Sequence, residues 1–190
     1  MKCGKTIKNE NTLICYDCTK YNHYFDRGFS IFEYQEIKGS LYRFKYAGRA
    51  EYARFYAKTA YENLGDTLRN LHADALVPIP IHSRRYRKRG YNQAEEFALQ
   101  ISNYLELPVY SQFIKRKAAT APLKKLSRIE RQNNLKRAFI ITRNDVKLKT
   151  IIIIDDIYTT GATIDAVSRV CRAAGVQNIY FLTVAIGNGI

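Results

Sequence analysis

A run of apolar residues that ends in two aspartates constrains this chain more than any other stretch. Residues 151–163 read IIIIDDIYTTGAT, so four isoleucines lead directly into Asp155 and Asp156. A short continuous apolar run is typical of a strand buried on both faces, as in a parallel sheet. In open α/β sheets, ligands bind beyond the carboxyl ends of such strands. The stretch therefore predicts a buried strand that carries two carboxylates into a ligand site.

The residues after the aspartates predict a phosphate-binding turn into a helix. Between Tyr158 and Thr163 the chain offers three threonine hydroxyls and a glycine that allows close backbone approach. The free N–H groups and the dipole of a helix N-terminus favour an anion at the same place. Paired carboxylates suit the vicinal hydroxyls of a sugar, so a sugar phosphate explains the whole pattern. The alternative, aspartates that only cap a turn, explains the carboxylates alone.

Strand-like and helical stretches alternate along the chain. Strands are expected at 27–34 (an edge strand or hairpin arm), 73–80, near 109–114, 138–141, 148–156 and 178–187. Helices are expected at 51–64, with Tyr52, Phe55, Tyr56 and Ala60 on one face, at 92–107, with Asn92 as the N-cap and Ala94, Phe97, Ala98, Ile101 and Leu105 aligned, and at 163–175. Such alternation predicts an α/β fold with a parallel sheet flanked by helices.

A second candidate site is the basic stretch HSRRYRKRGYNQ at 82–93, which holds five basic residues in the six positions 84–89. It follows a strand and precedes a helix, so we expect a turn at the same edge of the sheet as the aspartates. Arginine forks suit phosphate oxygens, and glycine allows close backbone approach. The predicted pyrophosphate ligands are Arg84, Arg85, Arg87, Arg89 and Gly90. An exposed basic loop without a specific ligand is the alternative.

The overall charge agrees with an anionic ligand. Lys and Arg outnumber Asp and Glu by 31 to 17 in 190 residues, which gives a net charge of +14 and attracts polyanions. Tyr42, Tyr46, Tyr52 and Tyr56 surround Lys45 and Arg49. Interleaved aromatic and basic residues stack nucleobases in some proteins, but the helical spacing of these tyrosines favours a place in the core.

The first 24 residues form an expected appendage with three of the four cysteines. Cys15-x-x-Cys18 is half of a tetrathiolate zinc site, and Cys3 is a further candidate ligand. A C-x-x-C pair that ends at Cys3 would begin one residue before Met1, so either the start lies upstream or the finger is incomplete. His23 and Asp17 are the candidates for a fourth ligand. Neither an apolar run of membrane-spanning length nor a signal-peptide core is present, so a cytoplasmic location is expected.

IIIIDDIYTTGAT resembles the phosphoribosyl-pyrophosphate (PRPP) motif of type I phosphoribosyltransferases. The resemblance implies that Asp155 and Asp156 are the catalytic residues and bind the ribose hydroxyls, and that Mg²⁺ accompanies PRPP. The 5′-phosphate would be held by Tyr158, Thr159, Thr160, Gly161, Ala162 and Thr163.

RYRKRGYNQA resembles the signature of the ComF competence-protein family, whose members join a phosphoribosyltransferase fold to a small N-terminal cysteine finger. Residues 116–139 resemble the same family's T-x-x-Q-x-x-L…R-x-x-N…AF pattern, except that Leu123 stands where the pattern has glutamine. The resemblance implies a partial zinc-finger-like segment at 1–24 and a phosphoribosyltransferase-like domain at 25–190. Its metal ligands would be Cys3, Cys15 and Cys18, with Zn²⁺ as the metal.

The resemblance also implies a role in DNA uptake during natural transformation. The expected partners are PRPP or a related phosphorylated nucleotide, single-stranded DNA and a helicase-like protein at the inner face of the membrane. Nine Lys or Arg residues lie between 115 and 137, where the loop would close over a polyphosphate or contact DNA. Two alternatives stay open: an active phosphoribosyltransferase with an unknown nitrogenous acceptor, and a PRPP sensor without turnover.

Overall fold

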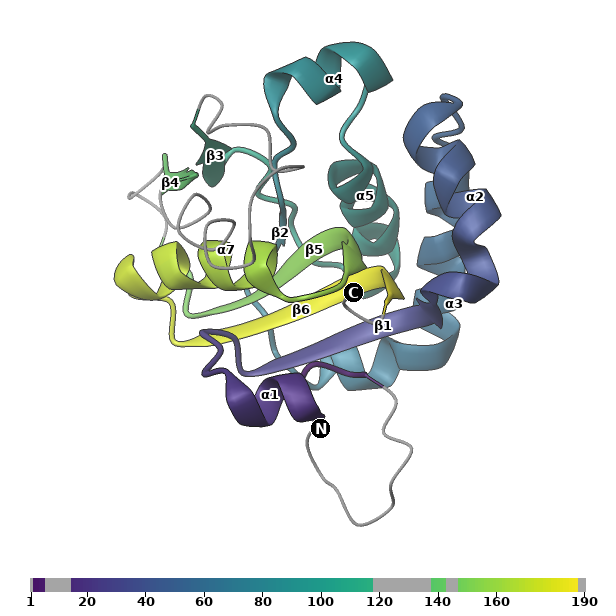
Figure 1. Cartoon of the computed structure of the whole chain (residues 1–190). Coiled ribbons are helices and arrows are strands. Elements are labelled where there is room, and N and C mark those ends of the chain that lie inside the picture. The colour runs from purple at the N-terminus through teal and green to yellow at the C-terminus, as the bar shows by residue number, and fades with distance from the viewer. Residues whose placement is uncertain (1, 6–14, 118–137, 143–146, 188–190) are drawn as a thin grey trace.

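The computed structural model describes residues 2–5, 15–117, 138–142 and 147–187. Its centre is a four-stranded parallel sheet in the order β1-β6-β5-β2 (Figure 1). The strands are β1 (Arg27–Glu33), β2 (Ala75–Pro78), β5 (Thr150–Tyr158) and β6 (Asn178–Ile186). The predicted α/β class and parallel sheet are confirmed. The basic loop at 118–137 lies outside the described residues.

The isoleucine run occupies the middle of the sheet, in β5. Because side chains alternate along a strand, Ile151 and Ile153 join the core beneath α7 (Ala162–Ala173). Ile152 and Ile154 join the opposite core, beneath α3 (Tyr52–Arg69) and α5 (Gln93–Leu105). All four side chains are fully buried, and each such burial stabilises the fold by about 1.5–3 kcal/mol. Helices therefore cover both faces of the sheet, as expected for a doubly apolar strand.

The helices predicted from periodicity are present, with one error in a buried face. In α5, the five aligned apolar residues are all buried. In α3, Tyr56 and Ala60 are buried, but Phe55 is 56% exposed, so its assignment to the core face was wrong. The buried stripe of α3 runs instead through small residues, which lets α3 pack closely against α5: Ala53, Ala57, Ala60 and Gly65.

β1 is followed by α2 (Tyr34–Tyr46), a helix that is not among the predicted elements. Its N-terminus is held by a capping box between Glu33 and Glu36, and it buries Leu41 and Phe44. Tyr42 and Tyr46 point outward and are 63% and 55% exposed. The expected core role is therefore wrong for these two tyrosines, although it is correct for the buried Tyr56 on α3.

The basic stretch is a helix and not the predicted turn. Residues Ser83–Arg89 form α4, and its first turn is capped by His82, whose Nδ1 accepts a hydrogen bond from the Arg84 N–H. Gly90 ends α4 in the left-handed conformation.

Asn92 is the N-cap of α5, as predicted, but its side chain does not cap the helix. It donates instead to the Ile79 carbonyl 3.0 Å away, so it ties the start of the helix to the end of β2.

Two further strands stand apart from the main sheet. β3 (Ile114–Arg116) and β4 (Phe139–Ile141) form an antiparallel pair, while Val109 makes a single parallel bridge to Leu76 of β2. β1 pairs in parallel with β6, so the edge-strand prediction is confirmed and the hairpin alternative is wrong. Within the described part of the chain, no helix is both long enough and apolar enough to cross a membrane.

Candidate functional site

The two aspartates lie where β5 extends beyond its shorter neighbour. β2 ends at Pro78, which pairs with Ile154, so no strand of the described residues pairs with β5 on that side from Asp155 onward. The strand alternation places Asp155 on the α7 side of the sheet and Asp156 on the α2 side. The carboxylates therefore diverge from a common backbone and face different surroundings.

Asp156 forms an ion pair with α2. Its Oδ1 lies 2.9 Å from the Nζ of Lys45, and the two side chains are only 14% and 16% exposed. A largely buried pair of this kind is costly to break, because removing one partner leaves the other charge without compensation. Lys45 is a site residue that the sequence reading did not assign.

Asp155 sits in a crowded electrostatic environment. Burial, followed by the neighbouring Asp156 carboxylate, raises the pKa of Asp155 to about 7. The N–H of Asp156 donates to Asp155 Oδ1 at 2.8 Å, and Lys45 and Arg116 also favour the ionised form. Burial first, and then Arg85 of α4, lowers the pKa of the Arg116 guanidinium. Arg116 of β3 and Arg85 of α4 thus approach the same end of the sheet as Asp155.

These opposite surroundings predict opposite effects of removing each charge. Because the folded-state pKa of Asp155 is raised, its ionisation costs stability, fully above pH 7 and less as the pH falls toward 4. Asp155→Asn should therefore raise the free energy of unfolding at pH 8 by about 1–3 kcal/mol, and the gain should fade between pH 7 and pH 4. Asp156→Asn should lower it by roughly 1–3 kcal/mol, because Lys45 loses its partner.

Urea denaturation of both variants and the parent protein at pH 4, 6 and 8 measures these differences. The electrostatic description of the site would be wrong if Asp155→Asn were destabilising at pH 8, or if its effect did not change with pH.

The predicted turn between β5 and α7 is present. β5 ends at Tyr158 and α7 begins at Ala162, with Gly161 at φ +76° in the N-cap position. The Gly161 carbonyl accepts the N–H of Asp165 at 2.8 Å, which closes the first helical turn. The first N–H groups of a helix have no partner within the helix, so this turn presents donors beside Thr159 and Thr160.

The Tyr158 side chain lies beneath the turn rather than in it. Its ring is buried and stacks on Phe181, with the ring centroids 4.9 Å apart and an interplanar angle of 4°. A Cβ atom at Gly161 would approach the Tyr158 hydroxyl to 2.6 Å. Tyr158 therefore supports the turn from below, and only its backbone faces the candidate site.

A cavity of about 860 Å³ lies between α2 and this turn, within the usual size range of small-molecule sites. We call it the α2 cavity. Its lining comes from α2 and the residue before it, from the turn, and from the ends of β5 and β6: Glu33, Tyr34, Gln35, Lys38, Gly39, Leu41, Tyr42, Arg43, Lys45, Tyr46, Ile157, Thr159, Thr160, Ile186 and Gly187. The ion pair between Lys45 and Asp156 thus links the cavity wall to the aspartates.

Of the predicted pyrophosphate ligands, Arg84, Arg85 and Arg87 are exposed on α4. Arg89 is placed differently. It donates to Gln93 at 2.6 Å, and its guanidinium lies 4.9 Å from the centre of the Tyr46 ring on α2. The basic helix and the α2 cavity are therefore in direct contact.

The three N-terminal cysteines come together near α1 (Tyr16–Lys20). The sulfur atoms of Cys3, Cys15 and Cys18 lie within 4.8 Å of one another, and those of Cys3 and Cys15 are 3.4 Å apart. Zinc–sulfur bonds of about 2.3 Å in a tetrahedron place sulfurs about 3.8 Å apart, so the cluster fits three zinc ligands. Among the described residues, the other two candidates are outside this cluster: Asp17 pairs with Lys5 at 2.7 Å, and Nδ1 of His23 lies 2.6 Å from Asp165.

The cysteine cluster is part of the main core and adjoins the underside of the turn. Cys3 is buried in the same core as Tyr158, and Lys5 Nζ lies 5.9 Å from the centre of the Tyr158 ring. Burial, followed by the nearby thiols of Cys3 and Cys18, raises the pKa of Tyr158. The division into segments 1–24 and 25–190 remains a prediction, but residues on both sides of this boundary share one core.

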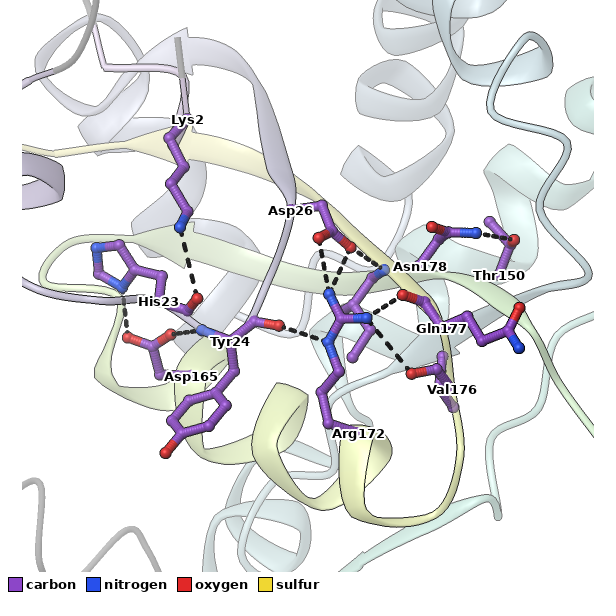
Figure 2. A network of polar contacts seen from close by, with 11 residues as sticks. Lys2, His23, Tyr24, Asp26, Thr150, Asp165, Arg172, Val176, Gln177 and Asn178 are labelled. Atoms are coloured by element: carbon purple, nitrogen blue, oxygen red, sulfur yellow. Dashed lines mark hydrogen bonds and ion pairs between the residues drawn. The ribbon is translucent and has the colours of Figure 1, made fainter.

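Figure 2 shows how the chain after the cysteines holds both ends of α7. Asp165, near the start of the helix, accepts from His23 and from the N–H of Tyr24. Arg172, near its end, makes two 2.7 Å contacts to Asp26 and donates to the Tyr24 carbonyl. The helix that follows the turn after β5 is thus fixed by the N-terminal segment.

Comparison with known proteins identifies the family. No family model matches the chain. The chain is, however, 30% identical to competence protein F of Haemophilus influenzae over 171 residues, which cover 87% of this chain and 75% of that protein. The chain belongs to the ComF family. This ComF-family chain is also 29% identical to competence protein ComFC of Streptococcus pneumoniae over 186 residues (93% of this chain, 77% of the other).

A third relative carries a different name. The ComF-family chain is 28% identical to the DNA utilization protein YhgH of Salmonella typhimurium over 182 residues, which cover 94% of this chain and 79% of that protein. The predicted family membership is therefore confirmed.

Proposed function

We propose that this ComF-family protein binds PRPP with Mg²⁺ at the carboxyl edge of its sheet and acts in DNA uptake during natural transformation. The ligand proposal rests on one observation: β5 leads through a short turn with the left-handed Gly161 directly into the start of α7. It places two carboxylates and a set of helix N-terminal donors on one short piece of chain. A sugar phosphate needs both kinds of group within a few ångströms.

In this proposal Asp155 and Asp156 accept hydrogen bonds from the ribose hydroxyls. Thr159, Thr160, Thr163 and the backbone of residues 158–162 hold the 5′-phosphate. The pyrophosphate lies toward α4, where Arg84, Arg85 and Arg87 are free to approach it and Gly90 leaves the backbone open; Arg89 also belongs to this set. Mg²⁺ would be bound chiefly by pyrophosphate and ribose oxygens, as suits an ion that keeps few protein ligands.

The names of the relatives support the DNA role. Two of them are competence proteins and the third is a DNA utilization protein. The net charge of +14 and the exposed basic α4 agree with an anionic polymer as partner. We place the activity on the cytoplasmic side of the membrane, beside a helicase-like partner, with Zn²⁺ on the three cysteines.

PRPP with Mg²⁺ is expected to raise the melting temperature. At about 100 times Kd, a ligand that binds only the folded state adds about 2.7 kcal/mol, or roughly 5–10 °C for a chain of this size. Asp156→Asn should remove most of this shift, because a charge-assisted hydrogen bond contributes about 1.5–3 kcal/mol. Differential scanning fluorimetry at millimolar PRPP and Mg²⁺ measures the shift.

Asp66→Asn is the matched control, because this exposed aspartate on α3 undergoes the same change of charge away from the site. A parent protein that does not respond to PRPP and Mg²⁺, or an Asp156→Asn variant that responds in full, would refute the proposed site.

Phosphoribosyl transfer to a nitrogenous acceptor is the second candidate function. It is favoured by Asp155, because a carboxyl group with a pKa of about 7 is suited to accept a proton near neutral pH. Pyrophosphate release from PRPP in the presence of individual nucleobases tests this candidate. Release that is absent with every base would leave PRPP binding without turnover.

A further inference from the structure

Two exposed tyrosines form one wall of the α2 cavity. Tyr42 and Tyr46 are one helical turn apart, and their ring centres are separated by 5.1 Å. Lys38 lies one turn before Tyr42 on the same side of α2. Thr159 and Thr160 of the phosphate-binding turn line the same cavity. Exposed aromatic rings therefore lie next to the proposed phosphate site.

The surroundings of these rings are predominantly cationic. Lys38 and Arg43 line the cavity, together with Lys45, whose charge is balanced by Asp156, and Glu33 is the acidic residue among the lining residues. The Arg89 guanidinium covers one side of the Tyr46 ring and joins the cavity to α4. Residues 84–89 of α4 contain no acidic side chain. The surface is thus positive around an aromatic centre.

This combination suits unpaired nucleobases. Every base has a face that stacks on an aromatic ring, and the negative backbone follows a track of basic residues. Base pairs inside a duplex are already stacked on one another, so their faces are not available to these tyrosines. Most of each tyrosine side chain is open to solvent, although the helix has a well-packed buried face. The unstacked base faces therefore favour a single strand over a duplex, while the positive charge attracts the backbone of either.

We propose that α2 is a stacking site for the bases of single-stranded DNA, with Tyr42 and Tyr46 contacting bases and Lys38, Arg43 and Arg89 contacting phosphates. The proposal rests on the DNA role proposed above and deepens it by assigning the surface that holds the strand.

The expected result is a loss of affinity when the rings are removed. Alanine substitution of one stacking residue costs about 1–3 kcal/mol per base, which corresponds to about 5- to 150-fold in Kd. Tyr42→Ala/Tyr46→Ala should therefore weaken binding of a fluorescein-labelled dT20 strand by at least about fivefold in an anisotropy titration. Tyr42→Phe/Tyr46→Phe should bind like the parent, since the ring is kept. Tyr24→Ala is the matched control, because this tyrosine is also exposed but lies beside α7.

Salt dependence and an abasic strand separate stacking from charge. The slope of log affinity against log salt should be unchanged in the tyrosine variants, because no phosphate contact is lost. It should fall in magnitude by about 0.7 for each phosphate contact removed by Lys38→Gln or Arg43→Gln. An abasic 20-mer of the same charge should bind the parent and the alanine variant equally.

The outcomes distinguish this inference from the proposal on which it rests. A parent protein that binds no single strand even at low salt would overturn the DNA role and the inference with it. A parent that binds dT20, together with an alanine variant of equal affinity, would overturn the inference alone. In that case the α2 cavity would have to serve a different partner. Circular dichroism melts of each variant confirm that the fold is intact.

Discussion

Gly161→Ala is expected to destabilise the protein by about 2–5 kcal/mol and to abolish its response to PRPP. Two costs add at this position. A residue with a Cβ strains the left-handed backbone by roughly 1–2 kcal/mol, and the new atom would lie 2.6 Å from the buried Tyr158 hydroxyl. Tyr158 is stacked on Phe181, so relief requires a shift in the core, for which overpacking costs of about 1–3 kcal/mol are typical. Urea denaturation and the PRPP-dependent melting shift measure both effects.

Two comparisons isolate the causes. Gly48 also has a positive φ, of +65°, but a Cβ there would meet no atom within 4 Å. Gly48→Ala should therefore show only the backbone cost and keep the PRPP response. Tyr158→Phe removes the atom nearest to the new methyl group, so it should restore part of the stability lost in Gly161→Ala. Equal costs for the two alanine variants would contradict the close support of the turn by Tyr158.

Zinc is expected to bind the cysteine cluster, but less tightly than it binds a complete four-ligand site. Three thiols converge, whereas structural zinc sites close all four positions. The purified protein should thus contain less than one zinc per chain after gel filtration in the presence of a mild chelator. Added Zn²⁺ at about 100 times Kd should raise stability by about 2.7 kcal/mol. Elemental analysis and melting curves measure the two quantities.

Cys15→Ser/Cys18→Ser should remove the zinc-dependent shift, while Cys171→Ala should keep it, because Cys171 is buried on α7 outside the cluster. One zinc per chain that survives the chelator would contradict the expectation of an incomplete site. The missing ligand would then have to come from outside the described residues or from another molecule.

The sheet and the turn between β5 and α7 could be predicted because their signals are local. The isoleucines of β5 are apolar on both faces, so the run itself indicates burial between two layers of helices. The aspartates and the glycine follow at fixed short spacings, so the site on this strand can be read without knowing its neighbours. α2 also carries a local signal in Ile37, Leu41 and Phe44, which are spaced as one helical face. The reading overlooked it.

Other parts of the site depend on contacts that no local pattern encodes. The pairing of Lys45 with Asp156 joins residues more than 100 positions apart. The place of Arg116 near Asp155 depends on how β3 and β4 pair outside the main sheet. Tyr42 and Tyr46 share the helical spacing of core residues, and only the packing of Leu41 and Phe44 decides which face of α2 is buried. The basic stretch forms a helix and not a turn, because arginine and lysine have high helix propensity, which its charge pattern does not reveal.

The position of β1 has a consequence for how this protein is made. β1 is an edge strand whose neighbour in the sheet is β6, the last strand along the described part of the chain. His23 contacts Asp165, and Asp26 contacts Arg172 and the N–H of Ile179. These contacts likewise depend on residues that are synthesised much later. During synthesis from the N-terminus, the first thirty residues therefore leave the ribosome long before their partners exist. Until β6 is made, the core that buries Cys3 is incomplete, so newly made chains pass through a stage in which this thiol is accessible to metal ions and oxidants.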